Sequence, residues 1–167
     1  MALVFYLVVA FGLWLGADAK CNKKARCCMA CPQGWTEYNS RCFKFFYEEK
    51  SWDNAENECI KLGGNLASIH TEADLDALLG MIKTSTGKNK QTWVGGHDTV
   101  KENCWRWSDG TPFNFTWWGN KEPNNFKDAE HCMELNFSKN PQHPNDWKCK
   151  DERSYICGRD MEVKDLQ

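Results

Sequence analysis

Hard oxygen donors are concentrated in the last third of the chain, between residues 122 and 146. Ca²⁺ in proteins takes about six to eight oxygen ligands at about 2.3–2.6 Å in a flexible geometry. This segment therefore predicts a calcium site, and a calcium ion that is open on one side can also hold the hydroxyl groups of a sugar. The donors are three carboxylates and two amides: Glu122, Asn124, Glu130, Asn145 and Asp146.

Two helices are expected ahead of these donors. The first begins after Ser51, a good N-cap residue, and ends at the glycine pair 63–64. Its apolar stripe consists of Trp52, Ala55, Cys59 and Leu62. The second begins after Thr71, and its apolar stripe consists of Leu75, Leu78, Leu79 and Ile82. Residues 84–91 are polar and are expected to form a loop.

Short strands are expected on both sides of the helices. Residues 110–131 show no hydrophobic period, and so long a loop in a compact domain is uncommon and usually functional. The order of one strand, two helices and then several short strands predicts an α+β domain. The expected strands span residues 41–47, 93–96, 104–107, 132–137 and 155–159.

The first nineteen residues are typical of a secretory signal peptide. Residues 2–15 form one apolar run, and Ala17 and Ala19 mark a cleavage site. A transmembrane anchor needs roughly 20 apolar residues, so we expect a secreted, extracellular protein without membrane insertion. The expected organisation is a signal peptide (1–19), a cysteine-bearing extension (20–30), one domain (31–159) and a C-terminal tail (160–167).

The charge balance argues against polyanionic partners. The chain has 23 acids and 21 bases, and loss of Asp18 with the signal peptide leaves it close to neutral. Because there is no basic block, we expect no nucleic-acid partner. Serine, histidine and aspartate residues are scattered without a catalytic motif, so we expect the protein not to be an enzyme.

The chain has ten cysteines, and all of them follow the predicted signal peptide. An even count in a secreted chain predicts disulfides rather than free thiols or zinc ligands. Cys28-x-x-Cys31 would be a redox or metal pair in a cytosolic protein, which is the less favoured interpretation here.

Two N-glycosylation sequons fit a secreted chain: Asn114-Phe115-Thr116 and Asn136-Phe137-Ser138. We expect glycans at Asn114 and Asn136. A glycan on Asn136 would lie close to the oxygen-donor segment and restrict access to it.

Several motifs in this order resemble those of the C-type lectin domain. The resemblance covers residues 31 to about 159, and stretches such as Gly95-Gly96-His97-Asp98 look like the soluble fish lectins and the related type II antifreeze proteins. The motifs are Cys31-Pro32-x-Gly34-Trp35, Trp93-Val94-Gly95-Gly96, Trp105-x-Trp107-x-Asp109-Gly110, Glu122-Pro123-Asn124 and the spacing of Cys59, Cys132, Cys149 and Cys157.

The resemblance implies a disulfide-stabilised fold with a long calcium-binding loop. The implied pairs are Cys31–Cys42, Cys59–Cys157 and Cys132–Cys149. The remaining cysteines would pair internally or link a homo-oligomer, and they are Cys21, Cys27, Cys28 and Cys104.

The resemblance also implies that the five oxygen donors form the family's principal calcium site, with a cis bond before Pro123. Vicinal sugar hydroxyls would complete the calcium shell and bond to the same side chains. Glu122 and Asn124 around the proline resemble the mannose-type arrangement, so mannose, fucose or N-acetylglucosamine are expected over galactose. The implied partners are glycans on cells or microbes, in innate immune recognition.

A second calcium site is implied at Asp98 and Glu102, with Glu130 shared. Here the chain departs from the family pattern, because His131 and Asn125 stand where the family often has aspartate. Histidine is a poor ligand for calcium, which prefers oxygen donors.

Two other functions share this fold. One is an ice-binding antifreeze protein of the type II kind, and the other is a protein-binding domain that has retained a calcium site. The complete set of five oxygen donors argues against the protein-binding alternative, and the antifreeze alternative rests on the resemblance only.

Overall fold

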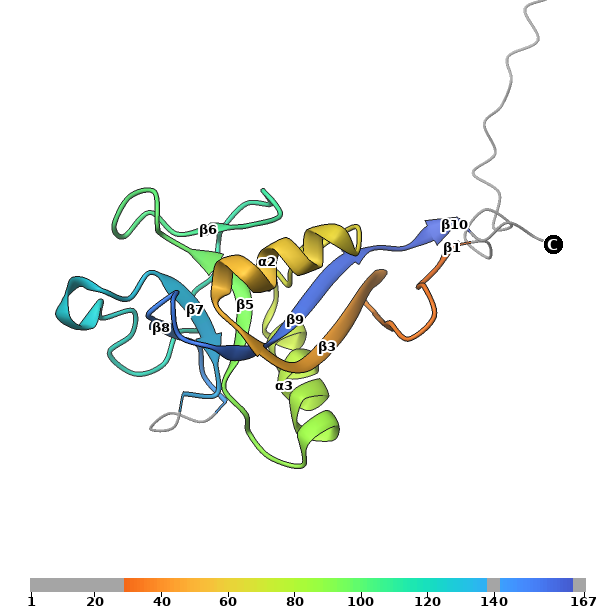
Figure 1. Ribbon diagram of the computed structural model, residues 1–167, viewed down its shortest axis with the longest axis horizontal. Helices are drawn as coiled ribbons and strands as arrows, with labels where there is room; N and C mark the ends of the chain where they lie inside the picture. Colours follow the sequence, from red (N-terminus) through yellow and green to blue (C-terminus); the bar gives the residue numbers. More distant parts are fainter. Residues whose placement is uncertain (1–28, 138–141, 164–167) are drawn as a thin grey trace, which may run out of the picture.

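The computed structural model of the chain describes residues 29–137 and 142–163 (Figure 1). The predicted signal peptide and Cys21, Cys27 and Cys28 lie outside these residues. Within the described ranges, no helix has the length and apolar character needed to cross a membrane. In chain order the elements are β1 (Met29–Ala30), β2 (Thr36–Tyr38), β3 (Arg41–Lys50), α2 (Trp52–Lys61), β4 (Asn65–Leu66), α3 (Glu72–Thr86), β5 (Thr92–His97), β6 (Arg106–Trp107), the 3-10 turn η1 (Phe126–Asp128), β7 (Cys132–Leu135), β8 (Asn145–Trp147), β9 (Arg153–Asp160) and β10 (Glu162–Val163).

One sheet forms the centre of the fold, with the path β2-β3-β9-β5-β7-β8. Strand β4 pairs with β9, and β6 pairs with β5. The pairs are antiparallel except for the parallel pair of β5 and β9. The α+β architecture with two helices and short strands is therefore confirmed.

Helix α2 begins and ends close to its predicted bounds. Ser51 occupies the N-cap position, but its side chain forms no capping hydrogen bond. The three buried residues of the helix, Trp52, Ala55 and Cys59, lie on the predicted stripe. This stripe packs against one apolar cluster, which also holds Leu66, Trp93 and Tyr155.

Helix α3 contributes Leu75, Leu78 and Ile82 to a second apolar cluster and is longer than predicted. Thr71 and Asp74 form a reciprocal capping box at its start. The prediction of a loop from residue 84 is wrong, because α3 continues to Thr86, whose hydroxyl donates to the carbonyl of Ile82 at 2.8 Å. The helix ends at Gly87, which has a φ of +73°.

Two predicted strands are shorter in the structure. The strand expected at residues 104–107 is reduced to β6, because the Cys104 amide donates to the Lys101 carbonyl at 2.9 Å within a turn. The strand expected at 132–137 ends at Leu135, since Asn136 has a left-handed φ of +64°. Strand β8 was not expected at all, because three residues are too few to show a period.

The three disulfides implied by the resemblance are confirmed: Cys31–Cys42, Cys59–Cys157 and Cys132–Cys149. Cys59–Cys157 spans 98 residues, and closing a loop of that length stabilises a fold by about 4–5 kcal/mol in the chain-entropy model. Cys104 has no disulfide partner among the described residues.

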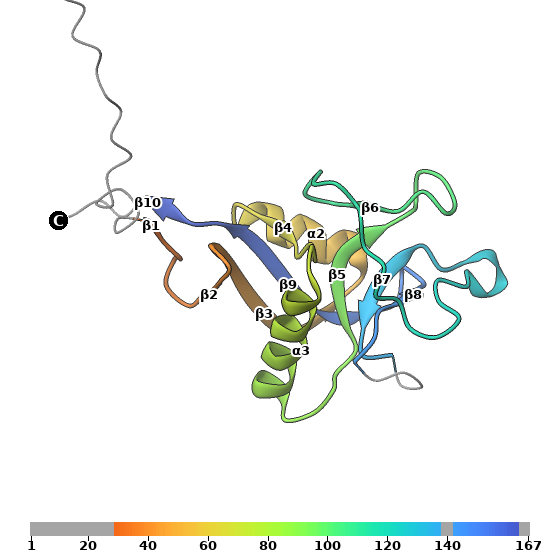
Figure 2. The ribbon, with the colours of Figure 1, turned by 180° about the vertical axis from the view of Figure 1, so that it is seen from behind.

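The ends of the described chain pair with each other. Met29 and Ala30 in β1 are antiparallel to β10, so the last residues of the predicted extension contact the predicted tail. This ribbon lies at one end of the molecule, whereas β7, β8 and η1 gather at the opposite end (Figures 1 and 2). The oxygen donors of the predicted calcium site therefore lie far from the terminal ribbon.

The two sequon asparagines lie in different environments. Asn114 is exposed. Asn136 is 3% exposed, its Nδ2 atom donates to the Lys90 carbonyl at 3.2 Å, and its Oδ1 atom accepts from the Gln142 amide at 3.1 Å. Because an N-glycan is attached to Nδ2, a glycan on Asn136 would disrupt this buried contact.

We therefore predict that the secreted protein carries a glycan at Asn114 and is unmodified at Asn136. Asn114→Gln should remove the mass that N-glycosidase releases from wild type, and Asn136→Gln should leave that mass unchanged. Mass spectrometry of the protein expressed in animal cells measures both. A glycan found on Asn136 of the folded protein would contradict the buried environment described for that residue.

Substitution of two glycines should have opposite effects on stability. A Cβ atom on Gly95 in β5 would lie 2.6 Å from the Leu66 carbonyl oxygen, so Gly95→Ala should lower the free energy of unfolding by about 1–3 kcal/mol. A Cβ atom on Gly80, exposed in α3, meets nothing within 4 Å, so Gly80→Ala should raise it by about 0.5–1 kcal/mol. Guanidinium unfolding of the oxidised protein measures both, and an unchanged stability for Gly95→Ala would refute the close backbone approach.

Candidate functional site

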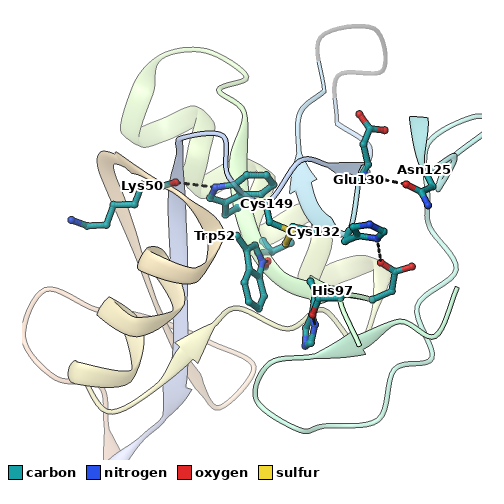
Figure 3. The surroundings of a disulfide bond; sticks show 12 residues. Lys50, Trp52, His97, Asn125, Glu130, Cys132 and Cys149 are labelled. Carbon is teal, nitrogen blue, oxygen red and sulfur yellow. Dashed lines mark hydrogen bonds and ion pairs between the residues drawn. A yellow bond between two sulfur atoms is a disulfide. The ribbon is translucent and has the colours of Figure 1, made fainter. Parts of the chain in front are cut away.

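The five predicted oxygen donors come from two segments at the β7–β8 end of the molecule. Glu122, Asn124 and Glu130 lie on the long connection between β6 and β7, and Asn145 and Asp146 lie on β8. Strand β8 pairs with β7, and the Cys132–Cys149 disulfide links the start of β7 to the residues that follow β8. Figure 3 shows this disulfide with Trp52 beside it. It also shows Asn125 and Glu130, which lie on the last part of the connection, just before β7.

Asp146 joins the two segments. Its Oδ1 atom accepts a hydrogen bond from the Asn124 amide at 3.0 Å, and its Oδ2 atom accepts one from the Asn125 amide at 2.7 Å. The Asn124 side-chain amide donates in turn to Glu122. The Glu122–Pro123 peptide bond is cis, as the resemblance implied. One buried carboxylate on β8 therefore holds the backbone of the Glu-Pro-Asn segment in place.

Glu130 is a buried acid with one carboxylate oxygen unpaired. It is 2% exposed, and its Oε2 atom accepts a hydrogen bond from the Phe126 amide at 3.1 Å. Its backbone amide donates to Asn125 Oδ1 at 3.0 Å (Figure 3). The Oε1 atom is buried and has no hydrogen-bond partner among the described residues. A buried, unpaired carboxylate oxygen is costly, and a bound cation would satisfy it.

Two carboxyl groups of this site, those of Glu122 and Glu130, have raised pKa values. Burial, followed by the Asp146 carboxylate, raises the pKa of Glu122 to about 7, and Glu130 adds to this effect while the Asn124 side chain opposes it. Burial is also the main cause of the raised pKa of Glu130, and Asp146 contributes again. Like charges disfavour the ionised forms, so a divalent cation among them would remove the repulsion. The oxygen donors of these residues are of the chemical type that calcium prefers.

Asn145 is oriented by a buried acid that the sequence did not indicate as part of the site. Its Nδ2 atom donates to Glu134 Oε1 at 3.3 Å, which leaves its amide oxygen as the atom able to ligate a cation. Glu134 is fully buried in β7 and forms an ion pair with Arg153 at 2.8 Å. Burial raises the pKa of Glu134 to about 7, against the opposing effect of Arg153. An acid inside the apolar run 132–135 was the signal that could have identified it.

Asp98 and Glu102, expected at a second calcium site, lie together with His131. The His131 Nδ1 atom is 3.1 Å from Asp98 Oδ1 and 3.3 Å from Glu102 Oε2. Among the described residues this is the one group of at least three histidine, cysteine or acidic side chains whose ligand atoms all lie within 4.8 Å of one another. The carboxylates of the five-donor site are therefore less closely gathered than this trio.

A comparison with family models matches the chain to the Lectin C-type domain over residues 48–159. The chain is 40% identical over 156 residues to the galactose-specific lectin nattectin of Thalassophryne nattereri, covering 93% of this chain and 94% of that relative. It is 37% identical over 154 residues to a C-type lectin mannose-binding isoform of Oxyuranus scutellatus, covering 91% and 96%.

Among solved structures, a calcium-independent type II antifreeze protein superposes with a TM-score of 0.71 at 28% identity, covering 80% of this chain and 97% of that one. The fold, the three disulfides and the matched family model agree with one another. The chain belongs to the C-type lectin domain family.

Proposed function

We propose that this protein is a secreted lectin that binds carbohydrates in a calcium-dependent manner through Glu122, Asn124, Glu130, Asn145 and Asp146. The observation that carries the proposal is the buried Oε1 atom of Glu130, which has no hydrogen-bond partner within residues 29–137 and 142–163 and lies beside two further carboxylates. Secretion is supported by the three disulfides, which persist in oxidising compartments.

The roles of the side chains follow from their donor and acceptor atoms. Calcium, when bound by these five residues, would supply open positions for two vicinal hydroxyl groups of a sugar. The carboxylates of Glu122 and Glu130 can accept hydrogen bonds from those hydroxyls, and the Asn124 amide can donate one. Asn145 contributes its oxygen to the cation, since its nitrogen already donates to Glu134.

The order of Glu122 and Asn124 around Pro123 supports a mannose-type preference, because acceptor and donor positions decide which hydroxyl stereochemistry fits. The named relatives include a galactose-specific lectin and a mannose-binding isoform, so overall similarity does not choose between the two sugars. We therefore base the expected preference for mannose, fucose or N-acetylglucosamine on Glu122 and Asn124 alone.

The biological targets that we propose are glycans on cells or microbes, in innate recognition. A single lectin site binds weakly, and linking two or more sites raises avidity by about 10²–10⁴. Cys104, which lacks a disulfide partner among the described residues, is a candidate for a link between subunits, as are Cys21, Cys27 and Cys28. Comparison of reducing and non-reducing gels tests this link.

Ice binding is the second candidate function, because the chain shares its fold with a type II antifreeze protein that is calcium-independent. A calcium-independent protein has no need of a complete set of oxygen donors, which this chain has retained. Thermal hysteresis with no sugar binding would favour ice binding over the lectin function.

We predict that wild-type protein is retained on mannose-agarose in calcium and eluted by chelator. The double variant Glu122→Gln/Asn124→Asp exchanges the donor and acceptor positions, so it should lose mannose retention and gain retention on galactose-agarose. Elution profiles on both resins, with and without calcium, measure the change.

Asp128→Asn is the matched control, because Asp128 is an exposed acid on the same connection and lies outside the five-donor set. It should behave like wild type on both resins. Wild-type retention that survives chelator would sink the calcium mechanism, and wild-type retention on galactose rather than mannose would sink the proposed specificity.

A further inference from the structure

We propose that Asp98, Glu102 and His131 form a second cation site that takes a divalent transition metal of the zinc class rather than calcium. The site is separate from the proposed sugar site, and it does not depend on sugar binding. It rests on the positions of three side chains that lie at the ends of β5 and β7 and in the turn after β5.

The spacing of the ligand atoms suits a four-coordinate metal. Zinc binds imidazole nitrogen and carboxylate oxygen at about 2.0–2.2 Å in tetrahedral geometry, which places neighbouring ligand atoms about 3.3 Å apart. His131 Nδ1 lies 3.1 Å from Asp98 Oδ1 and 3.3 Å from Glu102 Oε2. All three atoms lie within 4.8 Å of one another, so a small adjustment of Glu102 would complete one face of a tetrahedron.

Asp98 and His131 are held in place by the backbone. The Asp98 amide donates to the His131 carbonyl at 3.1 Å, and the His131 amide donates to the Trp147 carbonyl at 3.2 Å. The first bond continues the β5–β7 ladder, in which His97 pairs with Cys132, and the second continues the β7–β8 ladder, in which Cys132 pairs with Trp147. The two ligands therefore sit on neighbouring strands whose spacing is fixed before any metal binds.

The second oxygen of Asp98 has an orienting partner. Its Oδ2 atom accepts a hydrogen bond from the Asn103 amide at 2.8 Å, which turns Oδ1 toward His131. Ligating carboxylates in metal sites are commonly held by such outer hydrogen bonds. Asp98 is 2% exposed, whereas the side chains of Glu102 and His131 are 42% and 34% exposed. A metal ion and the water that completes its shell can therefore enter from the exposed side.

The donor set is poorly matched to calcium. Calcium requires about six to eight oxygen ligands, and this trio supplies two carboxylates and one imidazole nitrogen. Asn125 Oδ1 is engaged elsewhere, because it accepts a hydrogen bond from the Glu130 amide, and Glu130 is already one of the five donors assigned to the proposed sugar site. Imidazole combined with carboxylate favours zinc, cobalt or nickel.

A metal-free arrangement of the same atoms is an imidazolium ion held between two carboxylates. That ion pair would bind no transition metal, and it would make His131 a purely structural residue. Metal binding therefore separates the two interpretations directly.

The test is a titration of chelator-stripped, full-length secreted protein with Co²⁺, which reports a four-coordinate site by its strong visible absorption. Wild type should bind one cobalt ion, and Zn²⁺ should displace it while millimolar Ca²⁺ does not. Because outer-shell partners alone contribute about 10–100-fold to metal affinity, loss of a direct ligand in His131→Asn or Glu102→Gln should weaken cobalt binding by at least about 100-fold. His131→Asp should bind cobalt weakly and gain affinity for calcium.

Three controls keep the result specific. His143→Asn removes an exposed histidine and should leave cobalt binding unchanged. Cys104→Ser should also leave it unchanged, since a thiolate close to Glu102 in sequence is the obvious competing ligand. Thermal unfolding of each stripped variant shows whether it is folded. Absence of cobalt absorption in folded wild type, equal affinity in a folded His131→Asn, or loss of the signal in Cys104→Ser would overturn the proposal.

Discussion

The site depends on one interaction, the pair of hydrogen bonds from the amides of Asn124 and Asn125 to the carboxylate of Asp146. The connection between β6 and β7 is long and has little regular structure, so local propensity cannot fix its shape. Asp146 fixes it by satisfying two adjacent backbone donors with one buried side chain. Charge-assisted hydrogen bonds of this kind are stronger than neutral ones, and they bring Glu122 and Asn124 next to β8.

Asp146 can do this because β8 is itself held on several sides. Strand β8 pairs with β7, and the Cys132–Cys149 disulfide joins the start of β7 to the residues after β8. The Asn145 side chain in β8 donates a hydrogen bond to the fully buried Glu134. The ion pair of Glu134 with Arg153 links the β7–β8 pair to β9 in the centre of the sheet. The central sheet thereby supports a group of oxygen donors in which burial raises the pKa values of Glu122 and Glu130, and repulsion by the Asp146 carboxylate adds to that effect. Stability supplied by the scaffold offsets that repulsion.

Elements with a clear period could be predicted from sequence, and elements defined by pairing could not. The stripe of Leu75, Leu78 and Ile82 identified α3, but polarity alone ended the predicted helix three residues before Thr86. Strand β8 has three residues and was missed because its extended form depends on β7. Similarly, nothing local shows that Asn136 turns inward to the Lys90 carbonyl.

The candidate ligands were named from their chemical types and from a family resemblance, and the structure supplies the contacts between them. Sequence spacing could not show that one oxygen of Glu130 is buried with no partner in the described part of the chain, or that Glu134 orients Asn145. The family resemblance did indicate that His131 departs from the usual aspartate at that position. The consequence of that departure became visible when Asp98 and Glu102 were found on either side of its imidazole.

The most direct test of the account is calcium titration calorimetry on chelator-stripped wild type and Asp146→Asn. If the five donors form one cation site, wild type should bind calcium with a Kd in the micromolar to millimolar range. Asp146→Asn should weaken that binding at least about tenfold, since it removes one of three carboxylates and a contact to the Glu-Pro-Asn backbone. No calcium binding by folded wild type, or the same affinity in the variant, would contradict the account.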